Sequence, residues 1–457
     1  MDVADARADP PAPDRPDRNV AVDLARALAI VVVVWFHLSF FRLDLRFTPE
    51  GEPQLGFGMR SLGVVGWVGS WFLQIMPLFF VAGGFANTLV VDRHVRSGAS
   101  LGHYLALRGR RLIGPLTVYI GWWTLVGTIV AVFAGPETGA WFSGLLTRVL
   151  WFIVVYLLIV LIAPVMVRAQ DRWGWRVPVV LLAAALVVDT ASFLAHNPWI
   201  REINLLTVWP FAHQLGIAYA RGRWRTSPRW VSLVTAGAAA AAILVLLLIA
   251  PYPTTAVGLG DQAESNLAPP SAPMALLALV QVAGLALLER YAGAALAADL
   301  RLRRVLGVVN ALAMTLYLWH LPIIGLTAVL LMVPSLVLGH AVGFLLATPV
   351  YWLVGVPLLV ALVPLIGRLE YALIPPMGER QDTRLAVVGT LVLIVGLEII
   401  QRTGMVVHPG APMPTVGVGL FAIGALALAR ASNMPERRRG LPGGRGAGAQ
   451  ARRIHRV

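Results

Sequence analysis

The sequence predicts an all-α protein: a polytopic transmembrane helical bundle of about 10–12 spans with both termini in the cytoplasm. Three observations carry this prediction. The 457 residues are 58% hydrophobic and only 13% charged, with a mean hydropathy of +0.75. Several apolar stretches run for 18 residues or more, the length that crosses a bilayer as a helix. Arginines gather in alternate connections between these stretches.

Twelve apolar stretches are candidate spans. They cover roughly residues 20–41, 63–91, 112–134, 145–167, 177–195, 203–220, 231–250, 273–289, 305–333, 336–366, 385–401 and 415–430. Two of them, 63–91 and 336–366, exceed the roughly 20 residues that a span needs and contain prolines. We therefore expect tilted or broken helices there.

The remaining segments are polar tails. Residues 1–18, "MDVADARADPPAPDRPDR", are proline-rich and contain no apolar run, which indicates a disordered tail rather than a signal peptide. A membrane domain is expected over 19–366, two additional C-terminal membrane helices over 367–430, and a basic disordered tail over 431–457.

The placement of arginine predicts the orientation. Five arginines lie in 92–111, four in 221–229, four in 290–304 and eight from Arg430 onward. The intervening connections are poor in basic residues, and 135–144 and 251–272 contain none. By the positive-inside rule, the arginine-rich side and both termini face the cytoplasm. The connection 42–62, with three arginines, is a partial exception.

The composition also excludes several classes of function. The chain has no cysteine, so disulfides, thiolate metal sites and a cysteinyl acyl-enzyme are impossible. It has no lysine, and the bias towards Arg, Ala, Val, Gly and Pro suggests a GC-rich bacterial genome. The net charge of +14 comes from arginines spread over membrane loops, so we expect no nucleic-acid partner. No clustered His and carboxylate ligands indicate a metal.

The first span, "VDLARALAIVVVVWFHLSF" (22–40), contains three ionisable residues. Each ionisable group is costly inside a bilayer, by about 2.5–3.5 kcal/mol for Arg or Asp at the centre of a membrane helix, so it needs a reason to be there. Arg26 and His37 are eleven positions apart, which puts them on one helix face and roughly 16 Å apart along the axis. Asp23 is one turn from Arg26 and can pair with it. The structural alternative is an Asp–Arg pair at the boundary and a histidine satisfied by a backbone carbonyl.

Other polar and aromatic residues fall inside later spans. His213 in "WPFAHQLG" and His320 in "YLWHLP" lie at membrane depth, where a histidine is a functional candidate. A structural hydrogen-bonding role is the alternative for both. Tyr317 and Trp319 are candidates for the wall of a substrate cavity, with packing as the alternative. Asp189 and Glu398 are interpreted as rim or packing residues.

Several motifs occur in a fixed order along the chain. The first span has Arg26, ten residues, then His37. It is followed by "MPLFFVAGGF" (76–85), "ALRGRRLIGPLTVY" (106–119), "LWFIVVYLLIVLIAPV" (150–165) and "MTLYLWHLPII" (314–324). Together these resemble integral-membrane acyltransferase family 3, a family of bacterial membrane O-acyltransferases, over residues 18 to about 366. Gly83 departs from the family's usual serine, and no C-terminal hydrolase-like domain is present.

The resemblance implies transfer of an acyl group, commonly acetyl from acetyl-CoA, to a hydroxyl of a carbohydrate or related acceptor in the inner (plasma) membrane. A hydroxyl needs a base to attack a thioester, and a neutral imidazole suits that task, so His37 is the expected base. Arg26 is expected to orient the donor or to hold the network with Asp23. Guanidinium groups bind phosphate bidentately, so Arg108, Arg110 and Arg111 are expected to bind CoA. The alternative for these three is a purely topological role.

Two other functions stay open on the sequence. A secondary transporter or channel would have a similar number of spans, although the chain shows no convincing internal repeat. The second is a catalytically inactive family member that only binds its ligands. Gly83 keeps this possibility open, because the family's usual serine hydroxyl is absent there. The identity of the acceptor, the acyl length and the oligomeric state are not predicted.

Overall fold

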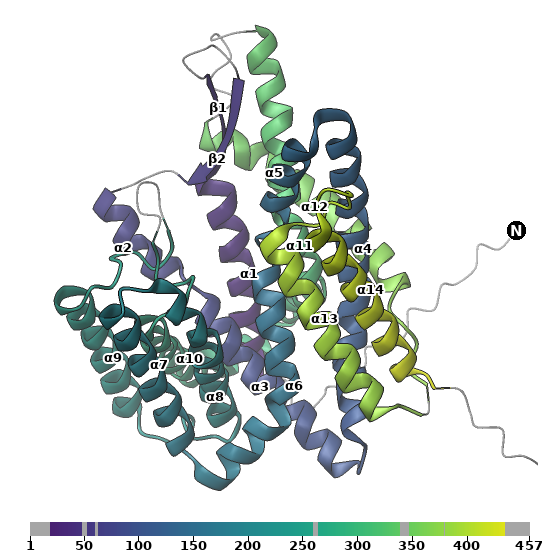
Figure 1. Cartoon of the computed structure of the whole chain (residues 1–457). Helices are drawn as coiled ribbons and strands as arrows, with labels where there is room; N and C mark the ends of the chain where they lie inside the picture. Colours follow the sequence, from purple (N-terminus) through teal and green to yellow (C-terminus); the bar gives the residue numbers. More distant parts are fainter. Residues whose placement is uncertain are drawn as a thin grey trace, which may run out of the picture.

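The computed structural model describes residues 19–47, 53–59, 63–258, 264–338, 347–378 and 380–434, which form a bundle of long helices (Figure 1). Eleven helical stretches in this part are long and apolar enough to cross a membrane. The predicted all-α polytopic fold is therefore confirmed, with eleven spans against the twelve that we counted. The disordered tails predicted for 1–18 and 431–457 lie outside the described residues, apart from 431–434.

Helix α1 (Val20–Phe40) packs against α3, α10, α11 and α12. It begins after Asn19, whose side-chain oxygen accepts a hydrogen bond of 3.1 Å from the Val22 amide and so satisfies one free donor of the first turn. The Asn19 amide donates to Glu289 on α10 at 2.7 Å. These two hydrogen bonds of Asn19 fix where the first span starts.

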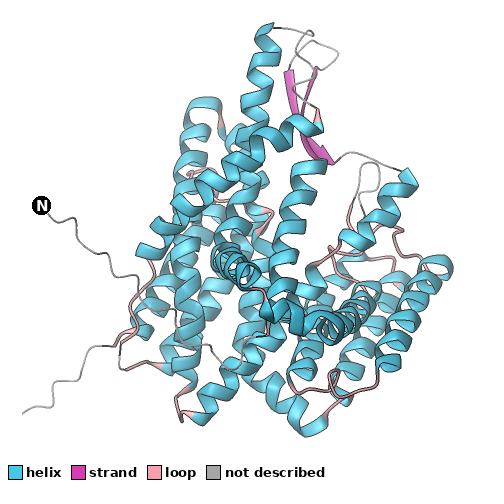
Figure 2. Ribbon diagram, turned by 180° about the vertical axis from the view of Figure 1, so that it is seen from behind, coloured by secondary structure: helices cyan, strands magenta, loops and turns pink. Residues whose placement is uncertain are grey.

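A β-hairpin follows α1. Strand β1 (Phe41–Phe47) pairs antiparallel with β2 (Pro53–Met59), with Phe41 opposite Met59 and Phe47 opposite Pro53. It is the one sheet in the described part of the chain, and it lies at one end of the molecule beside a long helix (Figure 2). We had treated 42–62 as a plain connection. The letters "FRLDLRF" alternate apolar and polar residues, which is the period of a strand.

The long apolar stretch from residue 63 is broken, as its length and proline predict. Helix α2 (Gly63–Leu73) ends before Gln74, and α3 (Met76–Arg96) starts with Pro77 in its first turn. Gln74 holds the break: its side-chain oxygen accepts from the Met76 amide at 3.1 Å, and its carbonyl accepts from Gln281 of α10 at 2.6 Å.

The next four helices contain the basic segment. They are α4 (Leu101–Ala134), α5 (Pro136–Thr147), α6 (Leu150–Trp173) and α7 (Arg176–Leu194). At 34 residues α4 is longer than a bilayer requires. It starts eleven residues before the predicted span at 112, so Arg108, Arg110 and Arg111 project from a rigid helix and not from a loop.

The predicted span 203–220 has a different form. It contains a 3-10 helix, η1 (Pro198–Leu206), and a short helix, α8 (Val208–Ala220). Twelve of the thirteen residues of α8 are buried, so the helix is enclosed by protein on all sides. Because α8 is enclosed by protein, it is apolar on all sides, which explains why the segment looked like a span. Its length explains why it is absent from the eleven long spans.

The helices of the second half complete the bundle. They are α9 (Arg229–Ile249), α10 (Ala272–Ala298), α11 (Leu300–Leu338), α12 (Thr348–Ala372), α13 (Thr383–Thr403) and α14 (Pro412–Ser432). The two additional C-terminal helices are thus present. They form an antiparallel pair that lies beside α4 (Figure 1). A Cβ added at Gly109 of α4 would approach Leu428 of α14 to 2.4 Å, which shows how closely the pair packs.

Asp189 of α7 is a packing residue, as we interpreted it. It is fully buried and accepts hydrogen bonds from Asn204 at 2.7 Å, Tyr252 at 2.8 Å and the Ala272 amide at 2.7 Å. These bonds tie η1 and the connection between α9 and α10 to the bundle. Glu398 forms an ion pair with Arg402 one turn further along α13.

Candidate active site

Two neighbouring cavities lie beside the middle and the end of helix α1. We call the larger one, of about 1030 Å³, the arginine cavity, and the smaller one, of about 250 Å³, the histidine cavity. Val33, Met76 and Tyr317 line both of them. The two cavities are therefore neighbours, and these three side chains stand at the boundary between them.

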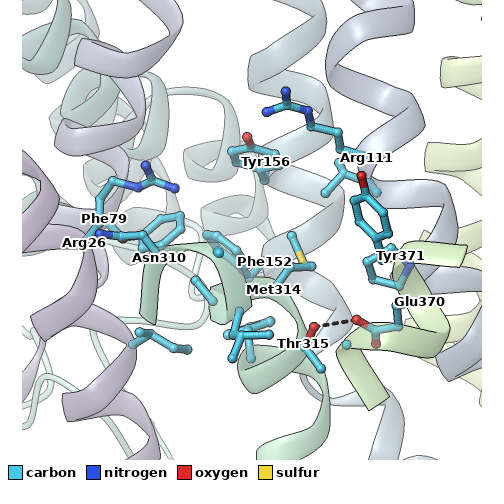
Figure 3. A pocket seen from close by; sticks show the side chains of 18 of the residues that line it. Arg26, Phe79, Arg111, Phe152, Tyr156, Asn310, Met314, Thr315, Glu370 and Tyr371 are labelled. Carbon is cyan, nitrogen blue, oxygen red and sulfur yellow. Dashed lines mark hydrogen bonds between the residues drawn. The ribbon is translucent and has the colours of Figure 1, made fainter. Parts of the chain in front are cut away.

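The arginine cavity contains five guanidinium groups, which belong to Arg26, Arg108, Arg110, Arg111 and Arg368. They come from three helices: α1, α4 and α12. In Figure 3 the side chains of Arg26 and Arg111 enter the cavity from opposite sides. One carboxyl group, that of Glu370, is among the lining residues. The cavity therefore has a large excess of positive charge and of hydrogen-bond donors.

Two of these arginines are anchored to the protein. Arg110 donates from Nη1 to the Pro375 carbonyl at 2.9 Å, and Arg108 donates from Nη2 to Oδ1 of Asn87. The Nε atoms of both are buried and have no hydrogen-bond partner among the described residues. Buried donors without partners are costly, so a ligand rich in acceptors would be well bound here.

Glu370 is fixed in the cavity wall where α12 packs on α4. Its carboxyl group is buried and accepts hydrogen bonds from Thr315 and from Nε1 of Trp319, the latter at 2.9 Å (Figure 3 shows the Thr315 bond). Trp319 lines neither of these two cavities, and its part in substrate binding stays a prediction. Its Nε1 donates to Glu370 of α12, and its ring has an edge contact with Tyr119 of α4. Tyr317 lines both cavities, and its part in substrate binding stays a prediction.

The histidine cavity contains His37 and His320. Their ring centroids are 4.8 Å apart. Nδ1 of His37 is 2.7 Å from the Val33 carbonyl, and Nδ1 of His320 is 2.6 Å from the Tyr317 carbonyl. A carbonyl can only accept, so each Nδ1 carries the hydrogen and each Nε2 of a neutral ring has a free lone pair. Nε2 of His320 is buried without a hydrogen-bond partner in the described part of the chain.

Polar groups from the other side of α1 complete this cavity. Ser70, Gln74, Arg148 and Ser265 are among its lining residues, together with backbone of the connection before α10. The Ser70 hydroxyl accepts from the Ala256 amide at 2.9 Å and so anchors that connection to α2. Hydroxyl, amide and guanidinium groups around an imidazole pair suit a polyhydroxylated ligand.

The spacing of Arg26 and His37 now has a structural meaning. The two residues share a helix face, as predicted, but each lines a different cavity. Asp23 lines neither cavity, and its backbone carbonyl accepts a hydrogen bond of 2.9 Å from Asn310, which lines the arginine cavity. The ion pair of Asp23 with Arg26 stays a prediction.

His213 is outside both linings. It is buried on α8, with Nε2 at 3.0 Å from the amide nitrogen of Asn87. The structure therefore does not bring His213 to a substrate cavity, which we had expected.

Gly83 stands on α3 where the family motif has serine. A Cβ built on Gly83 would meet no atom within 4 Å, so packing does not require glycine there. The next residue is different, because a Cβ on Gly84 would lie 2.0 Å from the His213 carbonyl oxygen.

Sequence reasoning missed Glu370, Arg148, Gln74 and Asn87. For two of them, the sequence offered a feature that could have indicated a functional role. Glu370 is an acidic residue just past an apolar span, and Arg148 is an arginine at the start of a span on the side that is poor in arginine. Asn87 and Gln74 had no such feature beyond being amide residues within apolar stretches.

Comparison with known proteins decides the family. The family model described as an acyltransferase domain, that of acyltransferase family 3, matches residues 19–368. The chain belongs to acyltransferase family 3. Both cavities of this acyltransferase are built mainly from the matched residues, and Glu370 lies two residues beyond them. No curated protein and no solved structure matches the chain. No group of three or more His, Cys, Asp or Glu side chains that could hold a metal occurs in the described ranges.

Proposed function

We propose that this membrane acyltransferase takes an acyl group, most simply acetyl, from an acyl-CoA in the arginine cavity and transfers it to a hydroxyl in the histidine cavity. The acceptor is a carbohydrate or a related molecule of the cell envelope or of metabolism. The observation that carries the proposal is the shared boundary of the two cavities, with guanidinium groups on one side and imidazoles on the other.

The arginine cavity has the chemistry of a CoA site. CoA carries several phosphate charges, and guanidinium is the side chain that binds phosphate with two parallel hydrogen bonds. A volume of about 1030 Å³ is at the upper end of small-molecule sites, as a nucleotide with a long thiol arm requires. The arm would run from the arginines of α4 along Tyr156 and Phe152 to Met76, so that the thioester stands at the boundary.

His37 supplies the base. Its Nε2 lone pair takes the proton of the acceptor hydroxyl, and the oxygen attacks the thioester carbonyl carbon. The tetrahedral intermediate then collapses, the C–S bond breaks, and the imidazolium returns the proton to the leaving thiolate, giving free CoA. The Val33 carbonyl holds the Nδ1 hydrogen and stabilises the imidazolium while it carries the proton. Nε2 of His320, which can only accept, is placed to take a hydrogen bond from a neighbouring hydroxyl of the acceptor.

The two substrates would arrive from opposite sides. Arg108, Arg110 and Arg111 belong to the arginine-rich segment 92–111, which the positive-inside rule places at the cytoplasm, where CoA is. The histidine cavity is lined by the arginine-free connection before α10, on the other side. In a bacterium this corresponds to the inner membrane, with the acceptor outside and both termini in the cytoplasm.

Purified full-length protein in detergent tests the proposal. Calorimetric titration with CoA should show saturable binding that weakens with added salt, and acetyl-CoA should release thiol slowly with water as the acceptor. Folded protein that neither binds CoA nor hydrolyses acetyl-CoA would contradict the donor assignment. Mass spectrometry of envelope glycans and secreted metabolites, with and without the gene, would identify the acceptor; loss of acetyl from neither fraction would contradict the acceptor class.

A further inference from the structure

A buried chain of hydrogen bonds stands behind one arginine of the arginine cavity. Arg108 lines the cavity from α4 and donates from Nη2 to Oδ1 of Asn87 on α3. The other end of the Asn87 amide is 3.0 Å from Nε2 of His213 on α8. Asn87 and His213 are each 1% exposed, and neither lines either cavity.

The direction of these bonds is fixed by chemistry. A guanidinium group can only donate, so the Asn87 oxygen faces Arg108 and its NH₂ group faces His213. Nε2 of His213 must then accept, which makes the ring neutral with its hydrogen on Nδ1. That Nδ1 is buried without a hydrogen-bond partner among the described residues. An apolar side chain at this position would avoid the cost of the unpaired Nδ1. We therefore attribute the histidine to its one hydrogen bond, with the Asn87 amide.

The helices are shaped to make this bond. Gly84 and Gly216 lie three residues from Asn87 and His213 respectively, one helical turn away on the same faces. A Cβ on Gly84 would be 2.0 Å from the His213 carbonyl oxygen, and a Cβ on Gly216 would be 1.9 Å from the Val81 carbonyl oxygen. The backbones of α3 and α8 are therefore in contact, and any larger residue would separate Asn87 from His213.

We propose that Asn87 and His213 are positioning residues that hold the Arg108 guanidinium in place to bind a phosphate of the acyl donor. This inference rests on the proposed function, because it assumes that CoA occupies the arginine cavity. The amide fixes one Nη2 hydrogen, so the unpaired Nε of Arg108 stays oriented for the ligand. A neutral partner is needed for this, since a carboxylate at position 87 would pair with the arginine and compete with phosphate.

Calorimetric titration of the full-length protein in detergent with CoA as the probe tests the proposal. Asn87→Ala should weaken CoA binding by roughly three- to thirty-fold, because Arg108 must then be ordered by the ligand. The effect should vanish in an Arg108→Gln background and persist in an Arg110→Gln background. Arg110 is the matched control, because it lines the same cavity but donates to Pro375 and not to Asn87.

His213 gives a second, independent route if Asn87→Ala yields too little folded protein. His213→Gln keeps an acceptor for the Asn87 amide and should retain CoA affinity within about twofold, whereas His213→Leu should lose affinity as Asn87→Ala does. Equal CoA affinity for the Gln and Leu variants would overturn the proposal. So would an Asn87→Ala effect of the same size in both arginine backgrounds. If Arg108→Gln and Arg110→Gln both leave CoA binding unchanged, the donor site itself is wrong, which is a separate failure.

Discussion

His37 and His320 face each other across 4.8 Å, and each ring bonds through Nδ1 to a carbonyl of its own helix. The carbonyls are those of Val33, one turn before His37, and of Tyr317, one turn before His320. Local helix geometry therefore sets the tautomer of both rings, and the tertiary packing of α1 on α11 only has to bring them together. One Nε2 lone pair can take the proton of a reacting hydroxyl, and the other can accept a hydrogen bond from a second hydroxyl of the same ligand.

The first prediction concerns donor binding. Arg110→Gln or Arg111→Gln should raise the Michaelis constant for acetyl-CoA more than it lowers turnover, because each removes a charge-assisted hydrogen bond worth about 1.5–3 kcal/mol. Inhibition by free CoA should weaken in parallel. Arg304→Gln is the control, since it removes the same charge from an arginine-rich segment but does not line the cavity. Donor kinetics that are unchanged in both variants would leave these arginines with a topological role only.

The second prediction concerns Glu370. Glu370→Ala should lower the stability of the protein by about 1–3 kcal/mol, because the buried indole N–H of Trp319 and the Thr315 hydroxyl lose their acceptor. Glu370→Gln keeps one acceptor oxygen and should lower the stability by less. Thermal unfolding of the detergent-solubilised protein, followed by intrinsic fluorescence, measures the difference. Equal melting temperatures for the Ala and Gln variants would argue against this hydrogen-bonded role.

The third prediction compares two adjacent glycines. Gly84→Ala should abolish or strongly reduce folded protein, since its Cβ would meet backbone of α8 that cannot move aside. Gly83→Ser should be tolerated with an unchanged melting temperature, because nothing lies within 4 Å of the added Cβ. Expression and size-exclusion profiles of the two variants check this directly. A destabilised Gly83→Ser protein would show that the departure from the family motif is required by packing.

The fourth prediction is the topology. Reporter fusions after residues 140 and 260 should report the outside, and a fusion at the C terminus should report the cytoplasm, as the alternation of arginine-rich connections requires. A C terminus that reports the outside would reverse the direction in which both substrates are proposed to enter.

Most of the fold followed from the sequence, for a physical reason. Bilayer thickness turns long apolar runs into helices, so span positions and the break before Pro77 could be predicted. Helix α8 and strand β1 are among the elements that escaped. The helix α8 is too short for a span and is apolar because protein surrounds it, which composition alone cannot distinguish from lipid. The strand "FRLDLRF" is shorter than a span, and its alternation was outweighed by its three charged residues.

Only those features of the candidate site that depend on a single helix could be predicted from the sequence. Helical periodicity put Arg26 and His37 on one face, because that depends on a single helix. The approach of His320 to His37, and of Asn87 to Arg108, joins segments 283 and 21 residues apart, so it depends on how helices pack. The hydrogen bonds of Trp319 to Glu370 and of His213 to Asn87 could not be predicted for the same reason, because they depend on how each helix is rotated against its neighbours.

The exchange of His37 for glutamine tests the central claim most directly. Glutamine can keep hydrogen bonds in the cavity but cannot take a proton. His37→Gln should therefore fold normally and bind CoA with unchanged affinity. Its thiol release from acetyl-CoA should fall by about 10²–10⁴-fold, nearly as far as in His37→Ala. If His37 serves only as a hydrogen-bonding residue on Val33, glutamine should work and alanine should lose stability instead. Folded His37→Gln protein that releases thiol at close to the wild-type rate would contradict the assignment of His37 as the base.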